Sequence, residues 1–491
     1  MTHTFQSGAP KPSHARVVAL FKESPWKTHP FCAALPAGDR VFLDAALKGV
    51  KRDFLESEKI LLPTGARPLL VIGLGEKKKW SQRKLVTASR KAIAAAKASR
   101  LEKLSVCIDD WAVSAIGKEK SAEAFAVNAE MAAYEFKKYL ETPKIGWPLV
   151  REITYHTTRG ADRGAVVRGI AAGKIIGEAT ALCRDLSNTP GGDMTPSILA
   201  REAQHALKGL PVKVSVLSEA EMKKLKMGGM LGVSRGSTEE AKLIVMEYGA
   251  KKEKPLVFLG KGITFDSGGL HIKPSNAMDE MHMDMSGGAA VIAAMKAIAQ
   301  LKVRHRVIGI VPAVENMPSG ESYRPGDILR SMSGKTIEVV SPDAEGRVVL
   351  ADAMTYAEQY EPRLAIDVAT LTGACVVALG HHASALLTPY EKIEKNLRAA
   401  GERSGDYLWP LPMWEEYETD VRGAVGDVLN ASRKREAGTI DGGMFLWQFA
   451  KKFAAWAHID IASTMTTAPD QFLAKGASGT AVRLLVEIAR A

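Results

Sequence analysis

Short apolar runs alternate with longer helix-like stretches from residue 212 to the C-terminus. A short apolar run bounded by polar residues predicts a buried strand, whereas a longer periodic stretch predicts a helix. We expect strands at residues 212–217, 243–248, 256–259, 306–311, 363–367 and 458–461. We expect helices at residues 287–301, 347–360 and 479–490. This alternation is typical of an α/β fold whose central, mostly parallel sheet is doubly wound.

The N-terminal third of the chain has a similar pattern but carries no site motif. Strand-like runs occupy residues 17–21, 68–72 and 104–108. With a helix-like stretch at 84–99, they predict a smaller, separate α/β domain. A helix expected from about Gly164 to Arg184 leads out of this domain, and the turn-forming residues after Asn188 end it. We therefore divide the chain into an N-terminal domain, a linking helix and a C-terminal domain, at residues 1–165, 166–190 and 191–491.

The composition is that of a globular chain with a large core. The chain has 491 residues, of which 46% are hydrophobic, so it can bury most of its apolar surface. No apolar run reaches the roughly 18 residues that a membrane helix needs, and the first residues lack the apolar segment of a secretory signal. The four cysteines are scattered and form no CxxC pair. They are typical of free thiols in a reducing compartment, so we expect a cytoplasmic protein without membrane contact.

The formal charge of +11 raises the question of a nucleic-acid partner. The densest basic segment is Lys77-Lys78-Lys79, followed by Arg83 and Lys84. A basic patch of this kind is typical of DNA binding. The segment has only Trp80 as an aromatic neighbour, so a solvated loop and helix face is the simpler interpretation.

The segment 260–284 carries the first candidate chemistry. It follows the expected strand at 256–259 and contains two lysines and two aspartates, namely Lys261, Asp266, Lys273 and Asp284. Lys261 and Asp266 are five residues apart, so they converge only if the chain bends between them, and Gly262 permits such a bend. Amines and carboxylates in loops at the end of a sheet indicate either a polar site or a set of solvated charges.

The second candidate segment, SPDAEGR at 341–347, lies between a strand-like run and a helix-like run. Asp343 is a good N-cap residue, and Glu345 suits the first turn of a helix, so an ordinary capped helix is one interpretation. A strand-to-helix loop is also where open α/β sheets present their sites. Together with Asp266 and Asp284, these residues form a set of four carboxylates that would repel one another without a cation. Such oxygen ligands suit two divalent ions, a known hydrolytic device.

These segments resemble the leucyl aminopeptidases, the cytosol aminopeptidase family. The matching text is GKGITFDSGG, IKP, MDM, PDAEGR and, at 369–374, ATLTGA. The spacings between the blocks also agree, and the resemblance runs from about Leu182 to the C-terminus. It implies a two-metal exopeptidase that releases N-terminal, leucine-like apolar residues from peptides by a metal-activated hydroxide. It also implies a homohexamer, in which the N-terminal domain serves mainly assembly.

The resemblance assigns metal ligands residue by residue. One ion, Mn²⁺ or Zn²⁺, would be held by Lys261, Asp266, Asp284 and Glu345. The other would be held by Asp266, Asp343 and Glu345. Lysine can be a ligand only as the neutral amine, so the resemblance requires burial and the two cations to lower its pKa strongly.

The remaining roles are also implied by the resemblance. Lys273 would stabilise the oxyanion that develops on the substrate. Arg347 would hold a bicarbonate ion that shuttles the proton, with help from backbone groups of Leu371 and Gly373. The pocket for the first substrate residue would be lined by Met281, Thr370, Ala462 and Met465.

Two departures from the family pattern and two alternative functions remain open. Ser341-Pro342 replaces the usual Asn-Thr before the second motif, and the segment 439–443, expected to be a loop, departs from the usual small residues. Ser234 lies in a G-x-S-x-G sequence, so a serine hydrolase is one alternative, although a nucleophile elbow needs a strand before it and a helix after it. A basic DNA-binding protein with a secondary peptidase role is the other.

Overall fold

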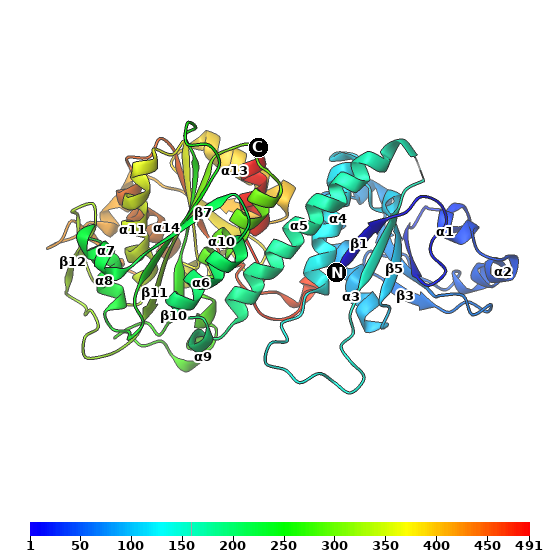
Figure 1. Ribbon diagram of the computed structural model, residues 1–491, viewed down its shortest axis with the longest axis horizontal. Helices are drawn as coiled ribbons and strands as arrows, with labels where there is room; N and C mark the ends of the chain where they lie inside the picture. The colour runs from blue at the N-terminus through cyan, green and yellow to red at the C-terminus, as the bar shows by residue number, and fades with distance from the viewer. Residues whose placement is uncertain (159) are drawn as a thin grey trace. The chain divides into compact units, whose positions relative to one another are not determined.

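The computed structural model describes residues 1–158 and 160–491, and they divide into two compact units. The first unit comprises Met1–Ala181 together with Ala468–Lys475, and the second comprises Leu182–Thr467 and Gly476–Ala491 (Figure 1). Helix α5 (Arg163–Asn188) is longer than the expected linking helix and contains the boundary between the units. No described helix is long and apolar enough to cross a membrane.

The first unit contains a six-stranded sheet in the order β1-β6-β5-β2-β4-β3. In the same order, its strands are Thr2–Phe5, Glu152–His156, Lys103–Cys107, Ala15–Phe21, Leu69–Gly75 and Ser57–Ile60. Neighbouring strands are parallel except for β3, which pairs antiparallel with β4. The strands expected from the apolar runs near residues 17, 68 and 104 are confirmed as β2, β4 and β5.

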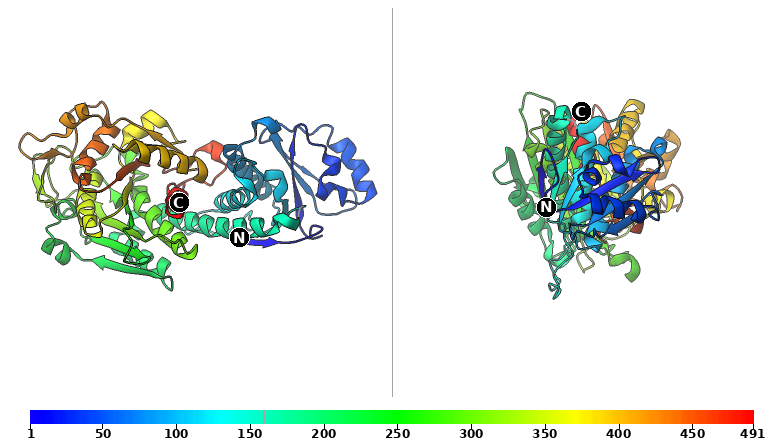
Figure 2. Two further views of the ribbon diagram at one scale, coloured as in Figure 1. Left: turned by 90° about the horizontal axis from the view of Figure 1, so that it is seen from above. Right: turned by 90° about the vertical axis from the view of Figure 1, so that its right-hand side faces the viewer.

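Helices cover both faces of this sheet. Successive residues of a strand point to opposite sides, so buried residues on each side pack against helices. Val17 of β2 packs in a cluster with residues of α3 (Gln82–Ala98) and α4 (Gly117–Ala133). Val18 packs in a separate cluster with residues of α1 (Pro30–Ala33) and α2 (Ala37–Ala46). The left view of Figure 2 shows α1 and α2 on one side of these strands and the cyan helices on the other.

The second unit contains a nine-stranded sheet in the order β16-β15-β18-β14-β9-β11-β8-β7, with β10 also paired to β11. In that order, and with β10 last, its strands are Leu408–Pro410, Ser384–Leu387, Trp456–Asp460, Leu364–Ala369, Leu256–Gly260, Val307–Asn316, Lys242–Tyr248, Val212–Leu217 and Gly262–Asp266. The central strands β18, β14, β9 and β11 are parallel, whereas β8, β7 and β15 are antiparallel to their inner neighbours. The expected α/β fold with a mostly parallel sheet is confirmed.

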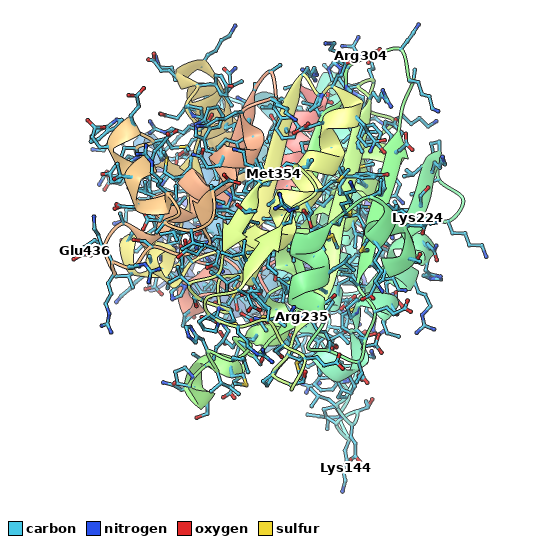
Figure 3. All side chains as sticks on the ribbon, turned by 90° about the vertical axis from the view of Figure 1, so that its left-hand side faces the viewer. Lys144, Lys224, Arg235, Arg304, Met354 and Glu436 are labelled. Atoms are coloured by element: carbon cyan, nitrogen blue, oxygen red, sulfur yellow. The ribbon has the colours of Figure 1, made fainter. Side chains whose placement is uncertain are left out.

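Two layers of helices enclose this sheet. Helices α10 (Ser286–Gln300), α6 (Pro196–Leu207) and α15 (Val482–Arg490) lie on one face. Helices α11 (Glu345–Ala357), α14 (Gly438–Ala450) and α8 (Gly228–Ser234) pack together on the other. In Figure 3, Met354 of α11 lies inside this layer, whereas Lys224, Arg304 and Glu436 point outward at the periphery.

The structure differs from the expected pattern at three places that bear on the site. The chain leaves β9 at Gly260 and continues after Lys261 as a strand, β10, where the sequence indicated only a bend. This close approach requires glycine, since a Cβ at Gly260 would lie 2.4 Å from the carbonyl oxygen of Gly287. The expected loop at 439–443 is wrong, because these residues belong to α14. Of the two interpretations of Asp343, the helix cap is excluded, because Ala344 is the N-cap of α11.

Candidate metal centre

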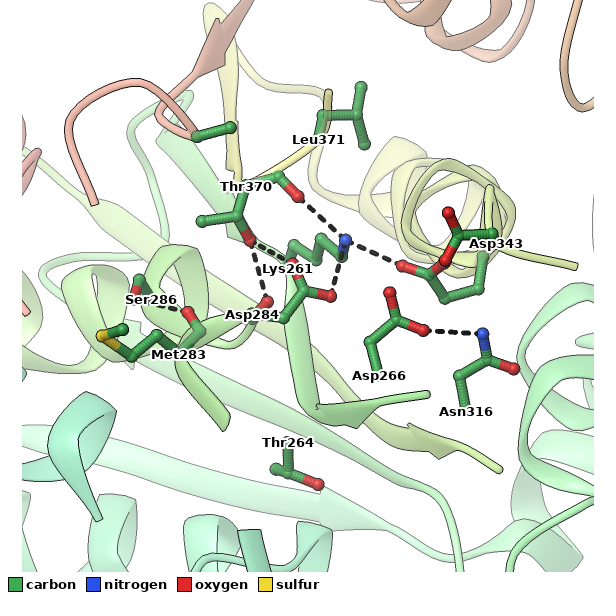
Figure 4. A network of polar contacts seen from close by, with 12 residues as sticks. Lys261, Thr264, Asp266, Met283, Asp284, Ser286, Asn316, Asp343, Thr370 and Leu371 are labelled. Carbon is green, nitrogen blue, oxygen red and sulfur yellow. Dashed lines mark hydrogen bonds and ion pairs between the residues drawn. The ribbon is translucent and has the colours of Figure 1, made fainter. Parts of the chain in front are cut away.

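The sheet of the second unit brings the candidate residues together at the carboxyl ends of its strands. Lys261 follows β9, and Asp266 is the last residue of β10. Asp284 follows the short helix η6 (Met281–Met283), and Glu345 is the first residue of α11. Asp343 lies in the loop between β13 (Thr336–Glu338) and α11. Open α/β sheets place their ligand sites at such strand ends, and Figure 4 shows Lys261, Asp266, Asp284 and Asp343 converging there.

Lys261 is the centre of the buried side of the cluster. Its Nζ lies 2.7 Å from Oδ2 of Asp284 and 2.8 Å from Oε1 of Glu345. The same nitrogen donates to the carbonyl oxygen of Thr370 at 2.9 Å. Helix α11 comes so near that a Cβ on Gly346 would lie 2.3 Å from Cε of Lys261. Contacts with two carboxylates, one backbone carbonyl group and helix α11 therefore fix the lysine side chain.

Lys273 occupies the more open side. Its Nζ lies 2.8 Å from Oδ2 of Asp266 and 2.6 Å from Oδ1 of Asp343. The side chains of Lys273 and Asp343 are 15% and 37% exposed, whereas that of Asp266 is 3% exposed. Asp343 is thus held by Lys273 and does not cap the helix that follows it. This side of the cluster is therefore the one exposed to solvent.

Three residues that the sequence did not single out help to orient the carboxylates. Asn316, the last residue of β11, donates through Nδ2 to Oδ1 of Asp266 at 2.8 Å and to the carbonyl oxygen of Pro342 at 3.0 Å. Tyr323 donates its hydroxyl to the same carbonyl oxygen. The backbone N–H of Gly268 donates to Asp266 at 2.8 Å. The position of Asn316 at the end of a strand is a sequence signal that could have identified it. No comparable sequence signal identifies Tyr323.

The second aspartate, Asp284, is oriented by a residue that the resemblance had placed elsewhere. Thr370 donates through Oγ1 to Oδ1 of Asp284 at 2.6 Å, so it positions a carboxylate of the cluster. Of the four expected pocket residues, it is the one joined to the cluster by a hydrogen bond in the described part of the chain. Met281, Ala462 and Met465 are half-buried.

The cluster carries an excess of buried negative charge. Four carboxylates face two lysines, and oxygens of Asp266, Asp343 and Glu345 lie within 4.8 Å of one another. Burial and neighbouring carboxylates raise the pKa values of Asp266, Asp284 and Asp343. Hard oxygen ligands in this number fit divalent cations, which would remove the repulsion between them.

The carboxylates raise the pKa values of both lysines. Burial lowers the pKa of Lys261, but the charges of Asp284, Glu345 and Asp266 raise it by more. The pKa of Lys273 is raised in the same way, chiefly by Asp266 after the opposing effect of burial. The ammonium groups therefore neutralise part of the carboxylate charge.

Arg347 lies on α11, two residues after Glu345 of the cluster, and is buried. Its Nη1 donates to the carbonyl oxygen of Asn430 at 2.9 Å. Of the two other residues expected near it, Leu371 already uses its N–H, which donates to Oδ1 of Asp460 at 3.0 Å. Gly373 is exposed and begins α12 (Gly373–Leu379).

The structure contradicts a nucleophilic role for Ser234. This serine is the last residue of α8, and it is 2% exposed. A nucleophile elbow needs a strand before the serine and a helix after it, whereas here a helix ends at the serine.

The basic segment of the first unit forms a short helix, η2 (Lys77–Lys79), in which Lys78 and Lys79 lie 3.3 and 2.7 Å from Glu76. Part of its charge is therefore neutralised locally.

Comparison with known proteins shows the family to which the chain belongs. Residues 181–486 match the model of the cytosol aminopeptidase family, catalytic domain, and residues 56–143 match that of the family's N-terminal domain. A probable cytosol aminopeptidase of Methylobacillus flagellatus is 37% identical over 99% of this chain and 98% of its own. A probable cytosol aminopeptidase of Syntrophotalea carbinolica is 39% identical over 91% and 92% of the two chains.

A solved structure shares the fold over nearly the whole chain. It is the bottromycin maturation enzyme BotP in complex with Mn, which superposes with a TM-score of 0.86 at 31% identity and covers 97% of this chain and 99% of its own. The family matches favour a peptidase over both alternatives, the serine hydrolase and the DNA-binding protein. The chain therefore belongs to the cytosol aminopeptidase family and is a metal-dependent aminopeptidase.

Proposed function

We propose that the cluster binds two divalent ions and removes the first residue from peptides. One ion would be held by Lys261, Asp266, Asp284 and Glu345. The other would be held by Asp266, Asp343 and Glu345, so that two carboxylates bridge the pair. The observation that carries this proposal is the set of four converging carboxylates, of which three approach within 4.8 Å of one another. When bound, paired divalent ions polarise a carbonyl group and activate a water molecule for attack.

The two lysines would do different work. Lys261 is enclosed by Asp284, Glu345 and helix α11, so its Nζ has no room to reach a substrate. As a ligand it must lose its proton, which cations in the same cluster favour by repulsion. Lys273 is partly exposed and its pKa is raised, so it keeps its proton. Its ammonium would stabilise negative charge on the substrate oxygen.

Arg347 would bind a small anion, bicarbonate, beside the reacting groups, with backbone groups of Leu371 and Gly373. Its burial and its unpaired Nε support this, since a buried guanidinium N–H normally has an acceptor. When bound, the anion would accept and return a proton. Among the described contacts of the cluster, no histidine lies in hydrogen-bond range to take that role.

The substrate would be a peptide with an apolar, leucine-like first residue. Met281, Met465, Ala462 and Thr370 are the residues proposed to line its pocket, and methionine adapts to side chains of varied shape. The metal would be manganese or zinc. Manganese is favoured by the similar structure that was solved with Mn.

The chain would act in the cytoplasm as a homohexamer. We propose an N-terminal domain at 1–165 that serves assembly, a linking helix at 166–190 and a catalytic domain at 191–491. The two family-model matches, to an N-terminal and a catalytic domain, support this division.

Chelation and reconstitution test the metal proposal directly. The purified protein is treated with a chelator, and hydrolysis of leucine p-nitroanilide is measured before and after Mn²⁺ or Zn²⁺ is restored. We expect activity to fall on chelation and to return with two bound ions per chain, counted by elemental analysis. Full activity with one ion per chain would refute the two-metal assignment.

A further inference from the structure

Part of the Arg347 guanidinium is left unpaired beside helix α14. The side chain is 7% exposed, and its Nη1 is satisfied by Asn430. Its Nε is buried and has no hydrogen-bond partner in the part of the chain that is described. Helix α14 passes close by, since a Cβ on Gly442 would lie 3.5 Å from Nη2. One edge of the guanidinium is therefore anchored, and its Nε–H remains to be satisfied.

The residue next to Gly442 on this helix is a carboxylate with unfilled acceptor positions. Asp441 is 2% exposed, and neither of its oxygens has a partner at full hydrogen-bond geometry among the described residues, although Ser432 is near enough to interact with it. Burial and the neighbouring Asp420 raise the pKa of Asp441 to about 6, against the opposing effects of Arg347, the Ser432 hydroxyl and Lys434. At pH 8 the group is therefore largely ionised. A buried carboxylate with too few donors is costly, and it normally has a partner.

An open donor and an open acceptor that are buried near each other are usually bridged by a small polar molecule. A bridging molecule must accept from the guanidinium of Arg347 and donate to the carboxylate of Asp441. Hydrogencarbonate does both, because it carries an anionic edge and an O–H group. Formate has a similar edge but no O–H group, so no hydrogen bond would offset the repulsion between its charge and that of Asp441.

We propose that Asp441 determines which anion binds at Arg347, by favouring anions that carry an O–H group over anions that have acceptor oxygens alone. This inference rests on the anion site proposed above. The charge of Asp441 repels every anion at this site, but only an anion with an O–H group offsets that repulsion by donating a hydrogen bond to Asp441. The repulsion therefore remains uncompensated for the competitors, which is a common source of specificity.

Anion titrations of the metal-loaded protein test the proposal through its melting temperature. The shift in Tm is measured against sodium hydrogencarbonate and sodium formate at pH 8 and constant ionic strength, since a ligand that binds the folded state raises Tm. For the unaltered protein we expect half-saturation at a concentration about tenfold lower, or less, for hydrogencarbonate, because hydrogen bonds to charged groups are strong. The dependence of kcat on each anion should show the same ranking.

The variant Asp441→Asn should lose this preference. Its amide is neutral and offers a donor, so formate should bind better, and the ratio of the two half-saturating concentrations should fall to about threefold or less. Asp441→Thr, which is neutral and smaller, should also lower the ratio and serves if the amide variant folds poorly. Asp420→Asn is the matched control, because it removes a neighbouring negative charge and should keep the preference.

An unchanged ratio in both Asp441 variants would overturn the proposal. The proposal would also be overturned if neither anion changed the Tm of the unaltered protein. That result would contradict the anion site at Arg347 as well. Neither result touches the metal cluster, because bound metal and hydrolysis after reconstitution are measured separately. A failed metal cluster would instead appear as lost metal with the anion preference in Tm retained.

Discussion

Lys273 is bound to Asp343 at 2.6 Å, on the open side of a cluster whose buried side is occupied by Lys261. The ammonium of Lys273 is held by carboxylates yet remains accessible from solvent. Lys261 is enclosed and contacts backbone as well as carboxylates. This difference in exposure distinguishes the two lysines, to which the resemblance assigns different roles.

Replacing each lysine by alanine should separate their roles. Lys273→Ala should lower kcat by about 10²–10³-fold with bound metal nearly unchanged, as expected for the loss of one oxyanion donor. Lys261→Ala should weaken one metal site, and excess metal should restore part of the activity. Both kcat and bound metal are measured for each variant. Loss of metal in Lys273→Ala, with retention in Lys261→Ala, would show that the roles are exchanged.

Gly346→Ala should disturb the cluster without removing a polar group. The added methyl group would meet Lys261, whose Cε and Nζ lie 2.3 and 2.6 Å from the position of the new Cβ. We expect metal affinity to fall by about 10–100-fold, the usual effect of disturbing a residue that orients ligands. Alanine has a higher helix propensity than glycine. The change in propensity should therefore not lower the thermal stability of the metal-free protein.

Gly320→Ala is the control for this substitution. A Cβ at Gly320 meets nothing within 4 Å, so metal affinity should stay at the level of the unaltered protein. Metal titrations followed by calorimetry compare the two variants. Equal affinities in Gly346→Ala and Gly320→Ala would show that the contact with Lys261 does not position the metal.

The bridging carboxylates should differ from Asp284 in their effect on metal content. Asp266→Ala and Glu345→Ala should abolish activity, because each residue is proposed to hold both ions. Asp284→Ala should empty mainly one site. Elemental analysis gives the number of ions per chain. Two tightly bound ions in Glu345→Ala would contradict its bridging role.

Glu338 should make stability depend on acid pH. Its Oε2 accepts backbone N–H groups of Ala424 and Val425 at 3.0 Å each, and these bonds lower its pKa from the usual 4.5. Because the folded-state pKa is the lower one, the stabilisation is present above about pH 4.5 and is lost as pH falls through the folded-state pKa. We expect Glu338→Gln to cost about 1–3 kcal/mol at pH 7.

The difference in Tm between Glu338→Gln and the unaltered protein, measured from pH 7 to pH 3, tests this. The two curves should approach each other below pH 4.5, since both side chains are then uncharged. Glu361→Gln serves as a control, because its side chain is 76% exposed and its loss should change little. A constant difference over the whole pH range would contradict the prediction.

The proposed hexamer can be tested by sedimentation at several protein concentrations. We expect a single hexameric species that retains activity. An active monomer would contradict the proposed assembly and the assembly role of the N-terminal domain. If the N-terminal domain serves assembly, deleting residues 1–165 should abolish the hexamer but leave the catalytic residues intact.

The sequence determined the fold class and most strands because buried parallel strands leave a local signal. The run at 256–259 is apolar throughout because both faces of β9 are covered. An unbroken apolar run of this kind can be recognised in the sequence. The motifs also placed Asp266, Asp284, Asp343 and Glu345 in loops at strand ends. In a parallel sheet such loops share one edge, so their convergence was compatible with the fold class, and the family resemblance predicted it.

Tertiary structure decided what each of these side chains meets. Asp343 had the local character of a helix cap, but Lys273, 70 residues away, competes for its carboxylate through a charged contact that local propensity does not contain. The segment 439–443 was expected to be a loop, whereas it belongs to helix α14, where a Cβ at Gly442 would lie 3.0 Å from Cδ2 of Leu371, a residue distant in the sequence. Asn316 and Asp441 gained their roles in the same way. Contacts between distant segments depend on how whole elements pack, and a single sequence records only the residues that take part.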